Sequence, residues 1–237
     1  MKRFKGYIFI AISLFCQTVS YSMSADTTSI LDNIYNYDFL LASERLAKLS
    51  EKDPLLIETL NLEKSWWIAI ELENTDHFSG FLTTLNQFEN SSKNCLDVII
   101  SSTYRMRYYA CTNKNYLIPF EFLKIRKHIE KVDAEYLKVS NHDGYELFVL
   151  YKSFLTLVQN SLFIDKILSV QQRNLVLIGD IDHIISNGSL PNRTLGRYFL
   201  MKYYLDIKKD KVKAFAYLSE LHNQYPNNKV FSQLLTN

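Results

Sequence analysis

Hydrophobic residues recur along most of the chain at steps of three and four positions, the period of a helix with one buried face. The first clear example has an apolar face formed by Phe39, Ala42, Leu46 and Leu49. Asp38 is placed to cap this helix. Pro54 is expected to end it, because the residue before a proline disfavours helical geometry. A short helix over residues 29–36 precedes it and completes a helical hairpin.

The same periodicity predicts helices along the rest of the chain. The predicted segments are residues 56–73, 81–89, 95–111, 119–137, 144–159, 174–186, 194–207 and 212–224. Six glycines and four prolines among 237 residues are few for a β protein with many tight turns, but they suit helices joined by short connections. The hydrophobic fraction of 47% is enough for a sizeable core. We therefore expect an all-α fold in which residues 26–237 form a single helical domain.

One spacing of small and large apolar residues occurs near both ends of the chain. It is found at Ala42, Leu46, Leu49 and Pro54, and again at Ala214, Leu218, Leu221 and Pro226. The small residue lets two helices approach closely, the leucines fill the space beside it, and the proline stops the helix. The recurrence therefore predicts two similar hairpins. A weaker echo of the spacing runs through Tyr116, Pro119 and Leu123.

This layout resembles the tetratricopeptide repeat, in which antiparallel helical hairpins stack into an α-solenoid. The resemblance implies such a stack, or an irregular helical array, with Tyr37 and Lys209 standing where the family usually has glycine. The first helices of the family's repeats line a concave groove, and the positions that map onto it are Phe199, Tyr203 and Asp206. These residues argue against the basic clamp of many peptide-binding members, and favour an aromatic or polar groove or structural packing alone. The paired Trp66 and Trp67 after the N-terminal hairpin, and the segment 198–228, also resemble exported tetratricopeptide-type proteins of Bacteroidetes.

The first 25 residues have the order of a signal peptide. Lys2, Arg3 and Lys5 precede an apolar run over residues 7–15, which is well short of the ~20 residues of a membrane span. We expect cleavage near Ser22 to Ala25 and a periplasmic or secreted protein, with an uncleaved anchor as the alternative. Removal of this segment takes the formal net charge from +2 to −1, so no nucleic acid or other polyanion is expected as a partner.

The three cysteines raise two further questions. Cys16 could be lipidated, but Phe15 and Ser13 do not fit the usual lipoprotein pattern, so cleavage beyond Cys16 is preferred. Cys95 and Cys111 lie at the two ends of one predicted helix, about 24 Å apart at ~1.5 Å per residue. A disulfide requires Cα atoms within ~7 Å, so we expect buried free thiols unless that helix is broken.

We identify no catalytic constellation, metal site or cofactor site in the sequence. Asp180 and His183 share one helical face, but two ligands do not make a metal site. Residues 175–180 (LVLIGD) could be a buried strand, but no phosphate-binding glycine motif follows, so a core helix is preferred. A GxSxG motif is also absent from the sequence, so nucleophilic catalysis has no support.

Aromatic residues are the most unusual feature of the composition, with 16 Tyr, 15 Phe and two Trp. Tyr104, Arg105 and Tyr108 could form a stacking surface for a peptide or a sugar, or mark the edge of the core. Adjacent side chains on a helix point about 100° apart, so at most one of Trp66 and Trp67 can be central in a helical interface. Trp66 could therefore remain exposed. The predicted partner-binding residues are Trp66, Tyr104, Arg105, Tyr108, Phe199, Tyr203 and Asp206.

We therefore predict a noncatalytic, exported helical-repeat protein that acts as a scaffold or adaptor for a protein or peptide partner, without a cofactor. The alternative is an exported hydrolase or carbohydrate-binding or -processing protein on a helical fold. Such an enzyme would need two carboxylates facing each other about 5 to 9 Å apart. A third interpretation, a structural assembly subunit, would need a large permanent interface.

Overall fold

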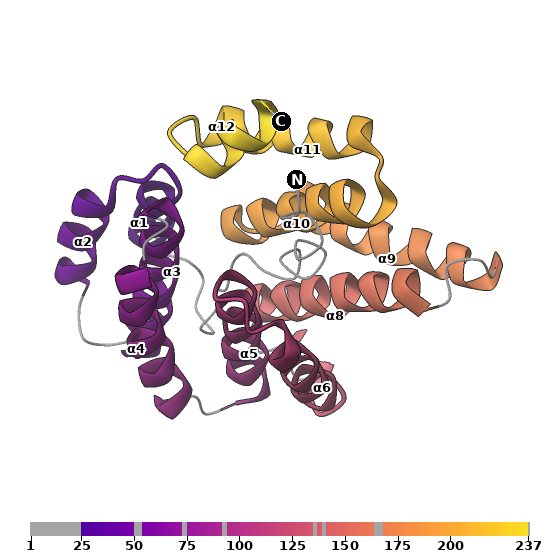
Figure 1. The fold of residues 1–237 in the computed structure, drawn as a ribbon, viewed down its shortest axis with the longest axis horizontal. Coiled ribbons are helices and arrows are strands. Elements are labelled where there is room, and N and C mark those ends of the chain that lie inside the picture. Colours follow the sequence, from indigo (N-terminus) through magenta and orange to yellow (C-terminus); the bar gives the residue numbers. More distant parts are fainter. Residues whose placement is uncertain are drawn as a thin grey trace.

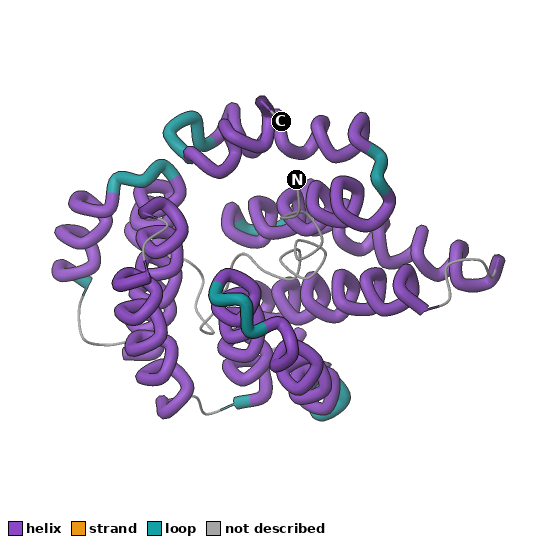
Figure 2. The backbone as a smooth tube through the Cα atoms, in the orientation of Figure 1, coloured by secondary structure: helices purple, strands orange, loops and turns teal. Residues whose placement is uncertain are grey.

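The computed structural model describes residues 25–49, 54–72, 75–91, 94–134, 137–138, 141–163 and 168–236. All regular structure in these residues is helical, which confirms the predicted all-α fold (Figure 2). The α-helices are α1 (Ala25–Tyr35), α2 (Phe39–Lys48), α3 (Pro54–Leu72), α4 (Thr75–Ser91), α5 (Cys95–Cys111), α6 (Ile118–Ile129), α8 (His142–Phe163), α9 (Leu168–Asn187), α10 (Leu190–Lys202), α11 (Lys211–Gln224) and α12 (Lys229–Thr236). A 3₁₀ turn, η3 (Asn115–Leu117), precedes α6, and a π-helical segment, η4 (Tyr203–Lys208), continues α10.

The apolar N-terminal segment predicted as a signal peptide, together with Cys16, lies outside the described residues. Among the residues that are described, a search for a helix long and apolar enough to cross a membrane finds none.

Helix starts follow the predictions where a capping side chain marks them. Asp38 caps α2 as expected, because its carboxylate accepts the Leu41 N–H at 3.3 Å. At the start of α5, the Asn94 side chain accepts the Asp97 N–H at 3.0 Å and the Asp97 side chain accepts the Asn94 N–H at 3.3 Å. This reciprocal capping box satisfies two donors that a helix start otherwise leaves without partners.

Helix ends were predicted less well. Pro54 does not end α2, which stops earlier at Lys48; it begins α3, where the missing N–H of a proline costs nothing. α6 ends at Ile129, whereas the periodicity predicted a helix to residue 137. The short helix α12 was not predicted at all. Pro226 behaves as expected, because it follows directly on the residue that caps the end of α11.

The spacing shared by the two ends of the chain marks packed faces in both places. Its buried members are Ala42, Leu46, Ala214, Leu218 and Leu221. The alanines let α1 approach α2 and α10 approach α11, and the leucines fill the space beside each crossing. The two hairpins are therefore built in the same way at these crossings.

The residues in place of the family's glycines adopt the backbone conformation that glycine normally supplies. Tyr37 has φ 62° and Lys209 has φ 57°, both in the left-handed region. After α1 the Tyr37 N–H bonds to the Ile34 carbonyl at 3.1 Å, and the Asp38 N–H bonds to the Asn33 carbonyl at 2.8 Å. This is the Schellman pattern of a helix end. The cap geometry is thus present although the glycine is not.

The first and last described hairpins pack against each other (Figure 1). Asn228, just after α11, donates a hydrogen bond to the Tyr35 carbonyl at the end of α1, at 3.0 Å. The Tyr35 ring meets Tyr225 edge-on, with centroids 5.1 Å apart, and Trp67 of α3 meets Phe231 of α12 at 6.0 Å. The first and last hairpins are therefore in direct contact, unlike the ends of an open stack.

The C-terminal half of the array centres on α8 and α10, with α9 packed on both. Phe154 of α8 stacks on Phe199 of α10, with ring centroids 4.2 Å apart and planes 13° from parallel. Tyr151 meets the same ring edge-on at 5.6 Å. These aromatic contacts hold the two helices in one register.

Candidate functional site

Four of the seven predicted binding residues lie in the interior. Trp66, Tyr104, Phe199 and Tyr203 are each at most 4% exposed. The other three, Arg105, Tyr108 and Asp206, are largely buried but keep some exposure to solvent. A partner could reach the four buried side chains only if the surrounding helices separated. Their part in partner binding stays a prediction, and the contacts they make are packing contacts.

Trp66 and Tyr104 belong to a buried cluster between α3 and α5 that also holds two opposite charges. The Glu63 carboxylate accepts hydrogen bonds from Trp67 Nε1, at 3.0 Å, and from the Tyr104 hydroxyl. The Arg107 guanidinium lies 4.1 Å from the centre of the Tyr104 ring and 5.2 Å from that of the Trp66 ring. Buried charges need such partners to persist away from water. The cluster therefore fixes how α3 and α5 pack.

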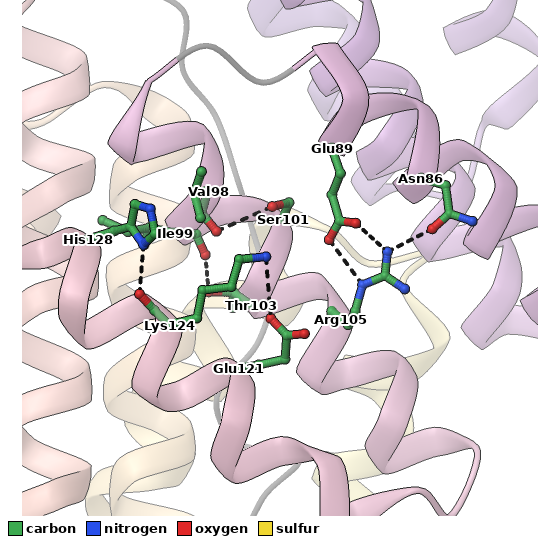
Figure 3. A network of polar contacts seen from close by, with 10 residues as sticks. All are labelled: Asn86, Glu89, Val98, Ile99, Ser101, Thr103, Arg105, Glu121, Lys124 and His128. Atoms are coloured by element: carbon green, nitrogen blue, oxygen red, sulfur yellow. Dashed lines mark hydrogen bonds and ion pairs between the residues drawn. The ribbon is translucent and has the colours of Figure 1, made fainter.

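Arg105 links α5 to α4 (Figure 3). Its Nε and Nη2 donate to the two carboxylate oxygens of Glu89 at 3.0 and 2.5 Å, and Nη2 also donates to Asn86 Oδ1 at 2.7 Å. Burial alone would lower the pKa of the guanidinium, but the hydrogen bond and charge of Glu89 outweigh it and raise the pKa. Tyr108, one turn on, lies 6.5 Å from Phe81 of α4. Both predicted binding residues thus take part in the α4–α5 contact.

The predicted groove residues lie at the junction of α10 and η4. The Asp206 carboxylate pairs with the Lys202 ammonium at 2.5 Å, and both side chains are largely buried. Tyr203 is buried. Burial also raises the pKa of the phenol of Tyr198, five residues earlier on α10, so this group stays protonated near neutral pH. The positions mapped onto the groove from the family resemblance are therefore covered by other parts of this chain.

A cavity of about 300 Å³ opens between α3 and α4. It is lined by Glu58, Asn61, Lys64, Ser65, Thr84, Gln87 and Phe88. Burial lowers the pKa of the Lys64 ammonium, whose Nζ donates to Ser43 Oγ at 3.0 Å. A glycosidase needs two facing carboxylates, and this lining supplies one, Glu58. The described lining therefore lacks the facing carboxylate pair of a glycosidase.

Candidate metal and thiol chemistry is sparse in the part of the chain that the structure describes. No group of three His, Cys, Asp or Glu side chains there could hold a metal ion. Asp180 and His183 lie on α9, so residues 175–180 are helical, as preferred from the sequence. Cys95 and Cys111 are free thiols at the two ends of one continuous helix, as the helical spacing predicted, but both are partly exposed and not buried as expected.

A line of exposed apolar side chains runs along the outer side of η3 and α6. Tyr116, Phe120 and Leu123, here called the α6 ridge, are 72%, 68% and 60% exposed. At 100° per residue, Phe120 and Leu123 point within about 40° of the direction opposite Ile125. Ile125 is fully buried, on a helix that packs on α5. The spacing echo at Tyr116, Pro119 and Leu123 therefore marks an exposed side and not a packed one.

A second exposed apolar surface lies on α9. Leu175 and Val176 are 69% and 65% exposed, and one turn on, a Cβ built on Gly179 would meet no atom within 4 Å. We call these three residues the α9 face. Residues 175–180 were predicted to belong to the core, but only the opposite side of the helix, at Ile181, is fully buried. The prediction of a helix is confirmed, whereas the prediction that this segment belongs to the core is wrong for Leu175 and Val176.

Sequence reasoning missed both surfaces, although one signal for the α6 ridge was present. Ile118 and Ile125 lie on one side of α6, while Phe120 and Leu123 lie on the other. A helix that is apolar on two opposite sides is either enclosed on both or exposed on one. Periodicity alone does not decide between these two cases.

Comparison with known proteins adds no relative to this picture. A scan against models of protein families found no match, and neither did searches of curated proteins and of solved structures.

Proposed function

We propose that the protein is an exported, noncatalytic helical scaffold that holds a protein partner against its α9 face. The observation that supports this is the adjacent pair Leu175 and Val176, both well exposed on an ordered helix. Covering an apolar pair removes its contact with water and favours association. The centres of protein interfaces are depleted of charged residues, and the α9 face contains none.

The shape of the α9 face also fits a protein partner. Gly179 leaves an open step beside the two apolar side chains, and its backbone is accessible there. Such a step admits a side chain from the partner, while the apolar pair supplies the surrounding contact area. A partner of standard size would cover about 800 Å² here and so extend over neighbouring helices as well.

The remaining parts of the proposal rest on other observations. Export is supported by the order of basic, apolar and small residues over positions 1–25. A scaffold role is supported by an interior in which aromatic and charged side chains contact one another, as Glu63 and Tyr104 do. Export and the scaffold role are therefore proposals that do not follow from the helical fold alone.

Site-specific photocrosslinking in native cells tests this function. A crosslinker replacing Val176 should give one dominant protein adduct, and a crosslinker at Thr83, an exposed residue of α4, should not. Leu175→Ser, added to the Val176 probe, should remove the adduct while the melting temperature stays unchanged. Adducts that are the same from both positions, or that survive Leu175→Ser, would contradict the proposal.

A further inference from the structure

We propose that the α6 ridge docks the protein on an anionic lipid surface. This site is separate from the α9 face and does not depend on the protein partner proposed for it. The inference rests on the combination of two features on one helix: apolar side chains that point outward, and basic side chains beside them.

The apolar part of the site has the geometry of an interfacial helix. Tyr116, Phe120 and Leu123 follow one another at steps of four and three, so they form a single line along the outer side. The opposite side of the helix, at Ile118 and Ile125, is anchored in the protein. An outward aromatic and aliphatic line of this kind buries its side chains at the boundary between headgroups and acyl chains when it lies on a bilayer. Tyrosine suits that depth because its ring is apolar and its hydroxyl is polar.

The basic part surrounds this line. The exposed basic residues of the segment are Lys114, Lys124, Arg126, Lys127 and Lys131. Residues 114–131 contain these five and only two acidic residues, whereas the rest of the chain contains 22 basic and 23 acidic residues. The positive charge is therefore concentrated around the ridge of a nearly neutral protein. A patch of this sign is attracted to anionic headgroups.

Internal ion pairs leave most of this charge available. Lys124 lies 3.8 Å from Glu121, and Arg126 lies 3.5 Å from Glu130, both at the long end of the range for ion pairs. The Arg126–Glu130 pair joins two exposed side chains, and such pairs are weak and exchange readily with other partners. The Glu121 side chain is largely buried, but the Lys124 side chain is 43% exposed. Lys127, which follows Arg126 directly, points to the same outer side as Phe120 and Leu123. Long lysine side chains can reach headgroups while their stems lie along apolar surface.

The same features favour a lipid surface over a groove on another protein. Lysine is depleted in the centres of protein interfaces, but Lys127 continues the line of the ridge. The ridge lies on a helix at the lower margin of the molecule in Figure 1, and its three side chains are at least 60% exposed. A bilayer needs no complementary shape, because lipids rearrange around inserted side chains.

Co-sedimentation of the full chain with vesicles tests the proposal. Vesicles of phosphatidylcholine with a minority of phosphatidylglycerol should bind the protein, and vesicles of phosphatidylcholine alone should bind it much less. Phe120→Ser combined with Leu123→Ser should weaken binding by about tenfold or more, because two buried apolar side chains are lost. Lys127→Gln combined with Lys131→Gln should weaken it by about tenfold at low salt and less at high salt.

The matched control is Leu175→Ser combined with Val176→Ser, which removes two apolar side chains of similar exposure from the α9 face. This variant should bind vesicles as the wild type does. Because all variants carry the same N-terminal segment, any binding through that segment is common to them and cancels in the comparison. Equal binding by the ridge variant and the wild type would overturn the proposal.

A positional readout distinguishes insertion of the ridge from attraction of the whole protein. Phe120→Trp should be quenched by lipids brominated on their acyl chains, whereas Val176→Trp should not. The native tryptophans, Trp66 and Trp67, are buried and provide a constant background. If the wild type fails to bind anionic vesicles, or if quenching is the same at both positions, the ridge is not a lipid-docking site. In that case the ridge would instead insert into a groove on a partner protein.

Discussion

The two helices of the α5–α6 hairpin differ in which kinds of residue they bury and which they expose. α5 buries residues that usually face water, among them Asp97, Thr103 and Arg107. α6 exposes residues that usually avoid water, Phe120 and Leu123. The two helices are neighbours in sequence and in space, so the difference does not come from separate domains.

The neighbours of each helix explain the contrast. α5 packs against α4 and α6 and shares the Glu63 cluster with α3, so its polar groups must find partners within the protein. Among the described helices α6 packs mainly on α5, and the side of α6 that carries Phe120 and Leu123 stays exposed. Binding chemistry therefore follows from which sides of a helix remain open, and aromatic content by itself is a poor guide to it.

The largest effect that would test this contrast is loss of the buried arginine. Arg107→Ala should destabilise the protein by roughly 3 kcal/mol, because it removes two cation–π contacts and leaves a cavity. Urea unfolding followed by circular dichroism measures the change. The matched change Arg126→Ala, at an exposed position of α6, should leave stability within about 0.5 kcal/mol. Equal costs for the two changes would show that α5 is not the enclosed member of the hairpin.

A hydroxyl deletion tests the hydrogen bond inside the cluster. Tyr104→Phe leaves the packing in place but removes a donor to the buried Glu63 carboxylate, which should cost about 1 to 3 kcal/mol. Tyr116→Phe on the α6 ridge is the control and should cost almost nothing, because water replaces the lost partner. The unfolding free energies of both variants, compared with that of the wild type, test whether the hydrogen bond from Tyr104 to Glu63 stabilises the protein.

The α4–α5 ion pair should have a smaller effect. A double-mutant cycle with Arg105→Ala and Glu89→Ala should give a coupling energy of about 1 kcal/mol, since the bond is bidentate but reached by water. The coupling should fall as salt is raised. No measurable coupling would mean that the half-buried side of α5 behaves like an open surface.

The smallest effect is expected on the ridge itself. Phe120→Ser should change the free energy of unfolding by no more than about 0.5 kcal/mol, because its side chain is already in water. Ile125→Ser, on the buried side of the same helix, should cost several times as much. A large loss of stability for Phe120→Ser would mean that the ridge is packed, and it would remove the basis for a docking role.

Local signals in the sequence were sufficient for the helices and for some of their ends. Period, the scarcity of glycine and proline, and capping side chains such as Asp38 act within a few residues, so they can be read without the fold. The free state of Cys95 and Cys111 followed from helix geometry alone. The packing role of Ala42 and Ala214 could also be predicted, because small residues at helix crossings are a local requirement.

The location of the open surfaces could not be predicted in this way. An i, i+4, i+7 apolar line has the same spacing whether it faces a core or solvent, so Tyr104 and Tyr108 looked like surface candidates while Tyr116 and Leu123 echoed a packed spacing. Which of these lines is covered depends on helices that are distant in sequence.

Sequence by itself determined that this protein is helical, where most of its helices lie, and how its two terminal hairpins are built, because those properties depend on contacts between nearby residues. Tertiary structure alone decided that the first and last described hairpins meet through Asn228 and Tyr35, that Glu63 and Arg107 are enclosed, and that the outer sides of α6 and α9 remain open. Burial is a property of the whole arrangement of helices, and no single segment contains that information.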